Sequence, residues 1–323
     1  MNICFLDNNP ISYDQTHLES NTIRGAEKSL INLALEFEKL GHKITVLNNI
    51  ETNKTYRNIR WININYYNEN INFDVAITNN DLNNFDKIKS HKKIAISHSI
   101  QSIEKFIRKK QLIAYLKYRP KIFLLGNYHK KKRSYLLRMF GSDIISWSVD
   151  NIFINTKLQN VDPYKAIFTS YVDRNLDLLI SIWINYIFQK NNKLKLYVTP
   201  NNKDNTKFNI YNRNFGTQKE LINDLITSKV FLVPGHKAEL FCIAAEEARE
   251  LCIPTVTLGI GSLSERIIHN KTGFIAKDEN EFSNYTLELF SDINIWNEIR
   301  NNLLSMRNKK NWKIIAEDIY KKI

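Results

Sequence analysis

The sequence has few cysteines. Its three cysteines, Cys4, Cys242 and Cys252, are too few and too far apart for a disulfide framework or a cysteine metal cluster. This scarcity favours a reducing compartment, and we expect a cytoplasmic protein. No apolar run approaches the roughly 18 residues of a membrane-spanning helix, and the start MNICFLDNNP lacks the features of a signal peptide. We therefore expect a soluble chain, or one bound peripherally at the inner face of a membrane.

Several catalytic signatures are also missing. The patterns D-x-D, H-E-x-x-H, C-x-x-C and G-x-S-x-G do not occur. Their absence removes support for a metal-dependent transferase, a zinc hydrolase or an α/β-hydrolase, and we predict no metal site and no cofactor. No signature of an RNA- or DNA-binding module is present either, so no nucleic-acid partner is expected.

The charge of the chain is strongly positive. Of the 323 residues, 43% are hydrophobic, which is enough to bury a core in each of two domains. The chain has 46 Lys and Arg residues against 33 Asp and Glu residues, a formal charge of +13. This excess favours an anionic partner: a nucleic acid, a phosphorylated small molecule or an acidic membrane surface. Charge alone leaves these three open.

Short β-rich runs alternate with helical patterns along most of the chain, which predicts βαβ units and mainly parallel sheets. Two such series predict an α/β fold with two Rossmann-like domains and a ligand cleft between them, at the carboxyl ends of the strands. We expect domains at 1–155 and 156–305, and a final helix in 306–323 that packs back on the first domain. The strands are expected at 2–7, 42–47, 59–65, 73–78, 92–97, 121–126, 143–149, 165–172, 194–199, 207–212, 229–235, 253–259 and 272–276.

The first strand is followed by the sequence RGAEKSLINLALEFEKLGHKITVL. Apolar residues recur there at helical spacing, so Gly25 is predicted to open a helix, where free amides and the helix dipole favour a phosphate. R-G-A-E and the following L-A-L…L-G-H-K-I-T-V resemble the G-G-x-E…G-H-x-V-x-V opening of retaining GT-B glycosyltransferases of family four, also called glycosyl transferases group 1. Arg24 stands where that family has its first glycine. The resemblance implies that Gly25 lies against the donor diphosphate.

Residues 229–276 resemble the most specific block of the same family, v-P-S…E-x-F-G-x-x-x-x-E-A…G-x-P-V…G…E…T-G-[FL]. A helix is predicted to begin near residue 240 and to present free amides to a diphosphate. The resemblance implies that Glu239, a predicted catalytic residue, contacts the donor sugar or the acceptor, and that Glu247, two turns later, contacts the ribose hydroxyls. Glu246 and Glu250 are expected on the solvent face. The donor-binding residues predicted from this helix start are Phe241, Cys242 and Ile243. The family writes E-G-F-G at 239–242, so Leu240 and Cys242 stand where it has glycines.

Three further positions complete the predicted site. Arg174, in SYVDRNLDLL, resembles the family's basic residue that binds the donor phosphates, where a cation would stabilise the leaving group. Asn175 replaces the glycine that follows this residue in the family. Gly216 and Thr217 fall where the family places the nucleotide base. His98 ends a predicted strand and matches a family histidine near the donor sugar. Asp150, in S-V-D-N-I-F, is predicted to be architectural.

Two basic runs lie in the first half of the chain, around 105–110 and 130–138, and tyrosines interleave with them at 115, 118, 128 and 135. They could hold an anionic membrane or a lipid-linked acceptor, resemble a nucleic-acid surface, or be solvated charge inflated by composition bias.

The predicted function is that of a retaining, metal-independent hexosyl- or related glycosyltransferase that moves a sugar from a nucleotide-diphosphate donor to a glycan, lipid or small-molecule acceptor. Its predicted context is cell envelope polysaccharide biosynthesis. Two alternatives remain: a non-catalytic GT-B-fold binding protein and a GT-B nucleotide-sugar epimerase.

Overall fold

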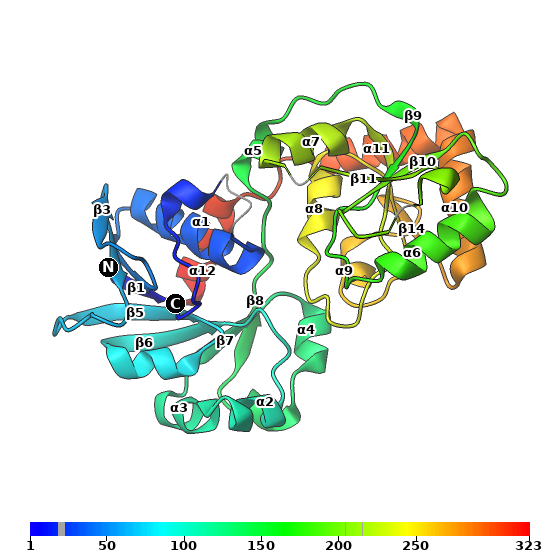
Figure 1. Cartoon of the computed structure of the whole chain (residues 1–323). Coiled ribbons are helices and arrows are strands. Elements are labelled where there is room, and N and C mark those ends of the chain that lie inside the picture. Colours follow the sequence, from blue (N-terminus) through cyan, green and yellow to red (C-terminus); the bar gives the residue numbers. More distant parts are fainter. Residues whose placement is uncertain (19–22, 204, 215) are drawn as a thin grey trace. The chain divides into compact units, whose positions relative to one another are not determined.

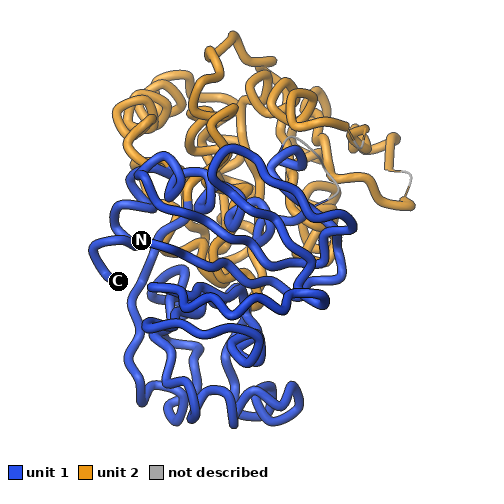
Figure 2. Tube along the Cα trace, turned by 90° about the vertical axis from the view of Figure 1, so that its left-hand side faces the viewer, with its two compact units in different colours: residues 1–147, 312–323 blue, residues 148–311 orange. Residues whose placement is uncertain are grey.

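Alternating strands and helices build two separate sheets in the computed structural model, which describes residues 1–18, 23–203, 205–214 and 216–323. The chain divides into unit 1, made of Met1–Trp147 and Trp312–Ile323, and unit 2, made of Ser148–Asn311. Figure 2 shows the two units in different colours. The domain limits expected from the sequence, 155/156 and 305/306, stay predictions.

Unit 1 holds an eight-stranded sheet of order β3-β4-β2-β1-β5-β6-β7-β8, in which only β3 runs antiparallel to its neighbour β4. Its strands are β1 Asn2–Leu6, β2 Lys43–Asn48, β3 Lys54–Tyr56, β4 Ile59–Asn63, β5 Asn72–Asn79, β6 Lys89–Ile96, β7 Lys121–Leu124 and β8 Ser142–Ile144. Its α-helices are α1 Gly25–Lys39, α2 Ile103–Arg108, α3 Gln111–Tyr118, α4 Asn127–Lys132 and α12 Trp312–Lys322, with 3₁₀ turns at η1 Gln15–His17, η2 Leu82–Lys87 and η3 Tyr135–Arg138.

Helices cover both faces of this sheet (Figure 1) because alternate side chains of a strand point to opposite sides. Phe5 of β1 packs on Phe37 of α1, with ring centroids 6.1 Å apart. Its neighbours Cys4 and Leu6 belong to the opposite core cluster, which includes Phe106 of α2 and Tyr115 of α3. The continuous apolar run of β1 is therefore explained by burial on two sides.

Unit 2 holds a six-stranded parallel sheet of order β11-β10-β9-β12-β13-β14. The strands are β9 Asp162–Ile167, β10 Lys195–Val198, β11 Ile210–Asn212, β12 Ser228–Leu232, β13 Thr255–Thr257 and β14 Gly273–Ile275. The helices are α5 Asn151–Asn155, α6 Leu176–Ile182, α7 Gln218–Ile226, α8 Ile243–Glu250, α9 Leu263–Arg266, α10 Glu279–Ser291 and α11 Ile293–Met306, with a π-helical turn η4 Trp183–Ile187 and a 3₁₀ turn η5 Thr206–Phe208.

The strand order of unit 2 is that of a doubly wound fold, in which the first strand lies in the middle and the chain reverses direction across the sheet after it. β9 and β12 are the two neighbours at this switch point. The same relation holds in unit 1 for β1 and β5. In open α/β sheets ligands bind beyond the carboxyl ends of such strands, which directs attention to the loops after these four strands.

Candidate active site

The loops after β9 and β12 bring together two of the predicted catalytic residues. Arg174 follows β9, and Glu239 follows β12, at the switch point of the unit 2 sheet. The Arg174 Nε atom lies 3.4 Å from the Glu239 Oε2 atom. A positive and a negative side chain, which come from segments 65 positions apart in the sequence, therefore share one edge of the sheet.

Glu239 is held from two sides. Its Oε1 atom accepts a hydrogen bond from the Cys242 amide at 3.1 Å, and its side chain is only 21% exposed. Burial raises the pKa of this carboxyl, and the Arg174 cation and the Cys242 amide oppose that rise. Arg174 also contacts Asp173 at 3.1 Å. The arrangement leaves a guanidinium for an anion beside a carboxylate that can accept hydrogen bonds from hydroxyl groups.

The helix after Glu239 begins later than expected. The sequence placed its start near residue 240, whereas α8 begins at Ile243, because Cys242 adopts a left-handed backbone (φ 57°) and serves as its N-cap. The Cys242 amide is taken by Glu239, and the amides of Ala245 and Glu246 bond the Cys242 carbonyl. Among the described residues, the amides of Phe241, Ile243 and Ala244 have no hydrogen-bond acceptor. The amides at 241, 243 and 244 are therefore the ones left without an acceptor at this helix start, whereas the amide at 242 is bonded to Glu239.

Cys242 is at once a predicted donor-binding residue and a core residue. Its side chain is 2% exposed and belongs to the apolar cluster of unit 2. Burial raises the pKa of its thiol, so the sulfur stays protonated. Phe241 is buried as well and lies under the Arg266 guanidinium, whose carbon is 4.6 Å from the ring centroid. Only Ile243 of the three is exposed.

Two positions where the family has glycine keep a glycine-like backbone. Asn175, next to Arg174, has φ 65°, and its side-chain amide donates to the Gly235 carbonyl at 2.5 Å. Cys242 has φ 57°. A left-handed conformation is natural for glycine and tolerated by asparagine, so the backbone at both positions is of the kind that glycine adopts readily. Neither Arg24 nor Leu240 has a positive φ.

The glutamates of α8 differ from the prediction in which of them are exposed to solvent. Glu247 is partly exposed, and it lies close enough to Cys242 to raise the pKa of that thiol. Glu246 and Glu250, which we expected on the solvent face, are 2% and 1% exposed, so that expectation is wrong. Arg249 and Arg266 pair with Glu246 at 2.7 Å and 3.2 Å. Arginines from α8 itself and from α9 thus lie beside the buried Glu246 carboxylate.

Gly216 and Thr217 form the start of α7. Thr217 is its N-cap, and Thr217 and Glu220 form a reciprocal capping box. The Glu220 Oε2 atom accepts from the Thr217 amide at 2.5 Å. A Cβ atom at Gly216 would collide with the Glu220 carboxylate. The two residues thus have a local structural role that is independent of any base contact. Nearby, Gln218 donates to Asp150 at 2.6 Å, in line with an architectural Asp150.

In unit 1, Gly25 begins α1 as predicted. Among the described residues, apart from its chain neighbours and its own helix backbone, no atom lies within 4 Å of the position that a Cβ would take there. The first turn is capped by Glu27, whose Oε2 atom accepts from the Arg24 amide at 3.0 Å.

His98 follows β6 and is mostly enclosed. Its ring stacks on Trp147 with centroids 5.8 Å apart, and its Nε2 atom lies 3.3 Å from the Asn79 Oδ1 atom. Burial, and then the neighbouring His129, lower the pKa of His98 to about 3, so its ring is neutral at pH 7. Because the Asn79 oxygen accepts, the Nε2 atom carries the proton.

Sequence reasoning missed a polar cluster at the unit 1 switch point. Asp7 follows β1 and is 5% exposed; its Oδ2 atom accepts from the Tyr13 hydroxyl at 2.7 Å and from the Asn79 amide at 3.5 Å. Asn79, at the end of β5, connects Asp7 to His98. The available signal was positional, since a polar residue directly after each of two neighbouring strands marks this edge.

Two doubly wound parallel sheets, each with polar side chains at its switch point, define the GT-B class of fold. The comparisons agree. Sucrose-phosphate synthase from Thermosynechococcus elongatus superimposes with a TM-score of 0.70 at 10% identity, covering 100% of this chain and 98% of that chain. HepE from Anabaena, solved with UDP-glucose, gives 0.70 at 13%, covering 100% and 99%. WaaG, described as a glycosyltransferase involved in lipopolysaccharide biosynthesis, gives 0.65 at 12%, covering 99% of each chain.

Residues 193–303 match the family model for glycosyl transferases group 1. The predicted resemblance to glycosyl transferases group 1 is therefore confirmed over these residues, and the GT-B fold is confirmed for the whole chain. The match supports an enzyme that transfers a sugar. No curated protein sequence matches the chain.

Within the described ranges, no cluster of three His, Cys, Asp or Glu side chains could hold a metal ion. No helix of the part of the chain that the structure describes is long and apolar enough to cross a membrane.

Proposed function

We propose that this protein transfers a sugar from a nucleotide-diphosphate donor to an acceptor with retention of configuration, and needs no metal to do so. The observation that carries the proposal is the Arg174–Glu239 pair beside the open amides of α8, at the switch point of the unit 2 sheet. A cation, free amides and a carboxylate at one edge suit a ligand that is anionic at one end and rich in hydroxyls at the other.

Each group has a distinct task in this proposal. Arg174 and the amides at 241, 243 and 244 bind the diphosphate and stabilise the charge that develops on it as the glycosidic bond breaks. Glu239 accepts hydrogen bonds from the sugar, and Glu247, further along α8, accepts them from the ribose. Gly216 and Thr217 lie beside the base. In unit 1, Gly25 and the neutral His98, which is hydrogen-bonded to Asn79, contact the sugar and the acceptor. The acceptor is a glycan or a lipid-linked molecule.

Donor screening tests this function. The chain is incubated with UDP-, GDP- and ADP-sugars and a panel of acceptors, with and without EDTA, and the anomeric configuration of the product is read by NMR. UDP-glucose is the first donor to try, since HepE, of similar fold, was solved with it. The proposal predicts a retained glycoside from one donor and an unchanged rate in EDTA. An inverted product or a rate lost in EDTA contradicts the corresponding part.

Leu240 and Cys242 favour one other candidate, a GT-B-fold protein that binds a nucleotide sugar without turning it over. Both side chains occupy positions where the family has glycine, and both are buried, at 5% and 2% exposure. Nucleotide binding with no transfer and no hydrolysis for any donor would favour this candidate. An isomerised sugar formed without acceptor would instead favour the epimerase.

A further inference from the structure

The positive charge of the chain is concentrated in one segment of unit 1. Residues 87–142 contain sixteen lysines and arginines and a single acidic residue, Glu104. The chain as a whole carries +13, so everything outside this segment carries a small net negative charge. A general bias toward lysine would spread the excess over both units. The concentration therefore belongs to this segment and calls for an anionic partner.

The same segment exposes large apolar side chains. Six of them are between 48% and 80% exposed: Ile107 of α2, Ile113 and Leu116 of α3, and Tyr135, Leu136 and Met139 in and beside η3. We call these six, with the exposed cations Arg108, Lys109, Lys110, Lys117 and Arg138, the α2–η3 surface. Figure 1 shows α2 and α3 next to one another, on the side of the unit 1 sheet away from α1.

Hydrogen bonds hold together the elements that carry this surface. The Ser134 amide, just before η3, donates to the Gln101 carbonyl, just before α2, at 2.9 Å. The Tyr115 hydroxyl of α3 donates to the Leu137 carbonyl of η3 and accepts from Arg133 at 3.2 Å. The exposed apolar groups are thus presented by one packed set of elements and are not the ends of separate loops.

We propose that the α2–η3 surface binds the surface of an anionic lipid bilayer. Its aliphatic side chains would enter the boundary between headgroups and acyl chains, and the surrounding cations would meet the lipid phosphates. This contact would hold the proposed transferase near a lipid-linked acceptor, but it does not depend on sugar transfer.

A nucleic acid fits the surface less well, although the interleaved tyrosines resemble such a site in the sequence. Tyr115 is completely buried, and Tyr118 stacks edge-on against Phe85 at 5.7 Å and contacts Asp86 through its hydroxyl. Of the four interleaved tyrosines, only Tyr135 is widely exposed, at 80%. Single-stranded nucleic acids need a row of aromatic rings for their bases, whereas exposed aliphatic groups contribute little to them.

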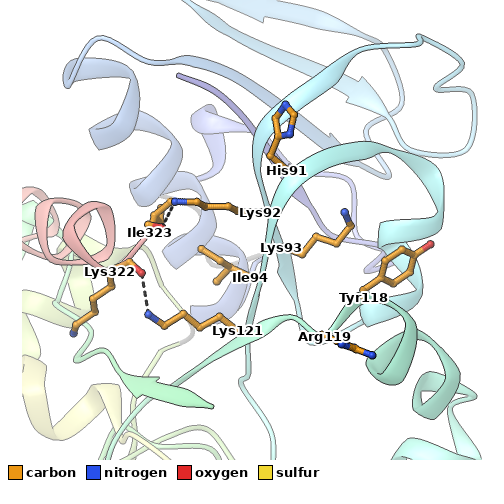
Figure 3. A pocket seen from close by; sticks show the side chains of 9 residues that line it. All are labelled: His91, Lys92, Lys93, Ile94, Tyr118, Arg119, Lys121, Lys322 and Ile323. Carbon is orange, nitrogen blue, oxygen red and sulfur yellow. Dashed lines mark hydrogen bonds between the residues drawn. The ribbon is translucent and has the colours of Figure 1, made fainter. Parts of the chain in front are cut away.

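A second basic region lies beside β6 and β7, and it differs from the α2–η3 surface because its lysines already have hydrogen-bond partners. Figure 3 shows this pocket, where Lys92 points toward Ile323 and Lys121 toward Lys322. Lys92 donates to the Ile323 carbonyl at 2.6 Å and Lys121 to the Lys322 carbonyl at 2.9 Å. These lysines already hold backbone carbonyls. On the α2–η3 surface, Lys117 pairs with Asp86 and Arg138 donates to the Arg133 carbonyl, whereas the ammonium groups of Lys109 and Lys110 have no partner among the described residues and are available to lipid phosphates.

Sedimentation of the full chain with vesicles tests the proposal. We expect binding to vesicles of phosphatidylcholine with about one-third phosphatidylglycerol, weaker binding as salt rises, and little binding to phosphatidylcholine alone. Lys109→Gln with Lys110→Gln should weaken binding about 25-fold, since each cation near an anionic surface contributes about fivefold. Ile113→Ser with Leu116→Ser should weaken it roughly tenfold or more while nucleotide binding is unchanged, because apolar insertion is lost.

Lys193→Gln with Lys207→Gln is the matched control, because both lysines are exposed and belong to unit 2. It should leave vesicle binding within about twofold, and circular dichroism should show every variant folded. Absence of binding to anionic vesicles overturns the proposal. So does an equal loss in the control pair, or tighter binding to a single-stranded polynucleotide that the serine variants do not weaken. A failure here leaves nucleotide binding untouched and is distinguishable from a failure of the proposed function.

Discussion

Asn175, which follows Arg174, and Cys242, whose amide bonds Glu239, have left-handed backbones at φ 65° and 57°. For a residue with a Cβ atom this conformation costs roughly 1–2 kcal/mol relative to glycine. The structure keeps both, next to Arg174 and at the start of α8, and strained backbone of this kind is often found at functional sites.

The strain at Cys242 can be measured with two variants. Cys242→Gly should be more stable than Cys242→Ala by about 1 kcal/mol, because only alanine has a Cβ to strain. At Ala245, inside α8, the sign should reverse, with glycine less stable than alanine by about 1 kcal/mol. Urea unfolding of the three variants against wild type measures this. Equal stability of the Cys242 pair would show that the backbone there is unstrained.

Glu239 should cost the protein stability at neutral pH. Its folded-state pKa is raised above the ordinary value of 4.5 by burial, so the fold prefers the neutral acid. Stability gained from this preference is fully present below pH 4.5 and is lost as the pH rises through the folded-state pKa. Glu239→Gln should therefore be more stable than wild type at pH 7 and not below pH 4, and it should lose sugar transfer. Thermal unfolding across this pH range measures the difference; a less stable variant at pH 7 contradicts the account.

The adjacent glutamates 246 and 247 should respond in opposite ways. Glu246→Ala removes the partner of Arg249 and Arg266 in a buried cluster, which should cost about 3 kcal/mol in denaturant unfolding. Glu247→Ala should leave stability nearly unchanged and weaken nucleotide binding roughly tenfold or more, because a charged hydrogen-bond acceptor is lost. Glu298→Ala, at an exposed position of α11, is the control for both measurements. If Glu247→Ala were destabilised but bound nucleotide normally, Glu247 would have a structural role and the prediction would be wrong.

The helical pattern of the sequence could not predict that Glu246 is buried and Glu247 partly exposed. The partners of Glu246 and Glu250 include Arg266 of α9 and Arg307, which follows α11, and such long-range partners are invisible to periodicity. The sequence did predict which residues meet at the switch point, because Arg174 and Glu239 each follow a strand that could be recognised.

At the scale of elements, the start of α7 depends on a contact among three residues. Gly216 leaves room for Glu220 to reach back to Thr217. Gly216→Ala and Glu220→Ala should each destabilise the protein by about 1 kcal/mol, the usual contribution of a cap. Because both remove the same contact, the double variant should lose about as much as either one. Additive losses in a double-mutant cycle would show that Gly216 acts in another way.

Helix starts could be predicted only in part, because the N-cap of α1 is Arg24 and that of α8 is Cys242, and neither is a usual capping residue. α1 begins at Gly25 as expected, where Glu27 completes the cap. α8 begins three residues later than expected because a cysteine, and not a glycine, adopts the left-handed conformation before it. A cysteine at position 242 gave no reason to predict a left-handed backbone there. Strand β3 was missed for a similar reason, since its three residues are exposed and show no alternation.

For the whole molecule, the alternation of strands and helices was enough to predict two parallel sheets, and every predicted strand has a counterpart. The recognisable family sequence spans only residues 193–303, whereas the fold resemblance covers the whole chain at 10–13% identity. Buried apolar strands tolerate exchange among residues of similar size, so the fold outlasts the sequence pattern in unit 1.

The central claim is that the edge of the unit 2 sheet beside Arg174 and Glu239 binds a nucleotide diphosphate. Thermal unfolding of the full chain with increasing UDP, GDP and ADP tests this claim most directly. We predict that one of the three raises the melting temperature, corresponding to about 2.7 kcal/mol at a concentration of 100 times the Kd, and that Arg174→Ala abolishes the rise. No stabilisation by any of the three, or an equal rise in Arg174→Ala, would contradict it.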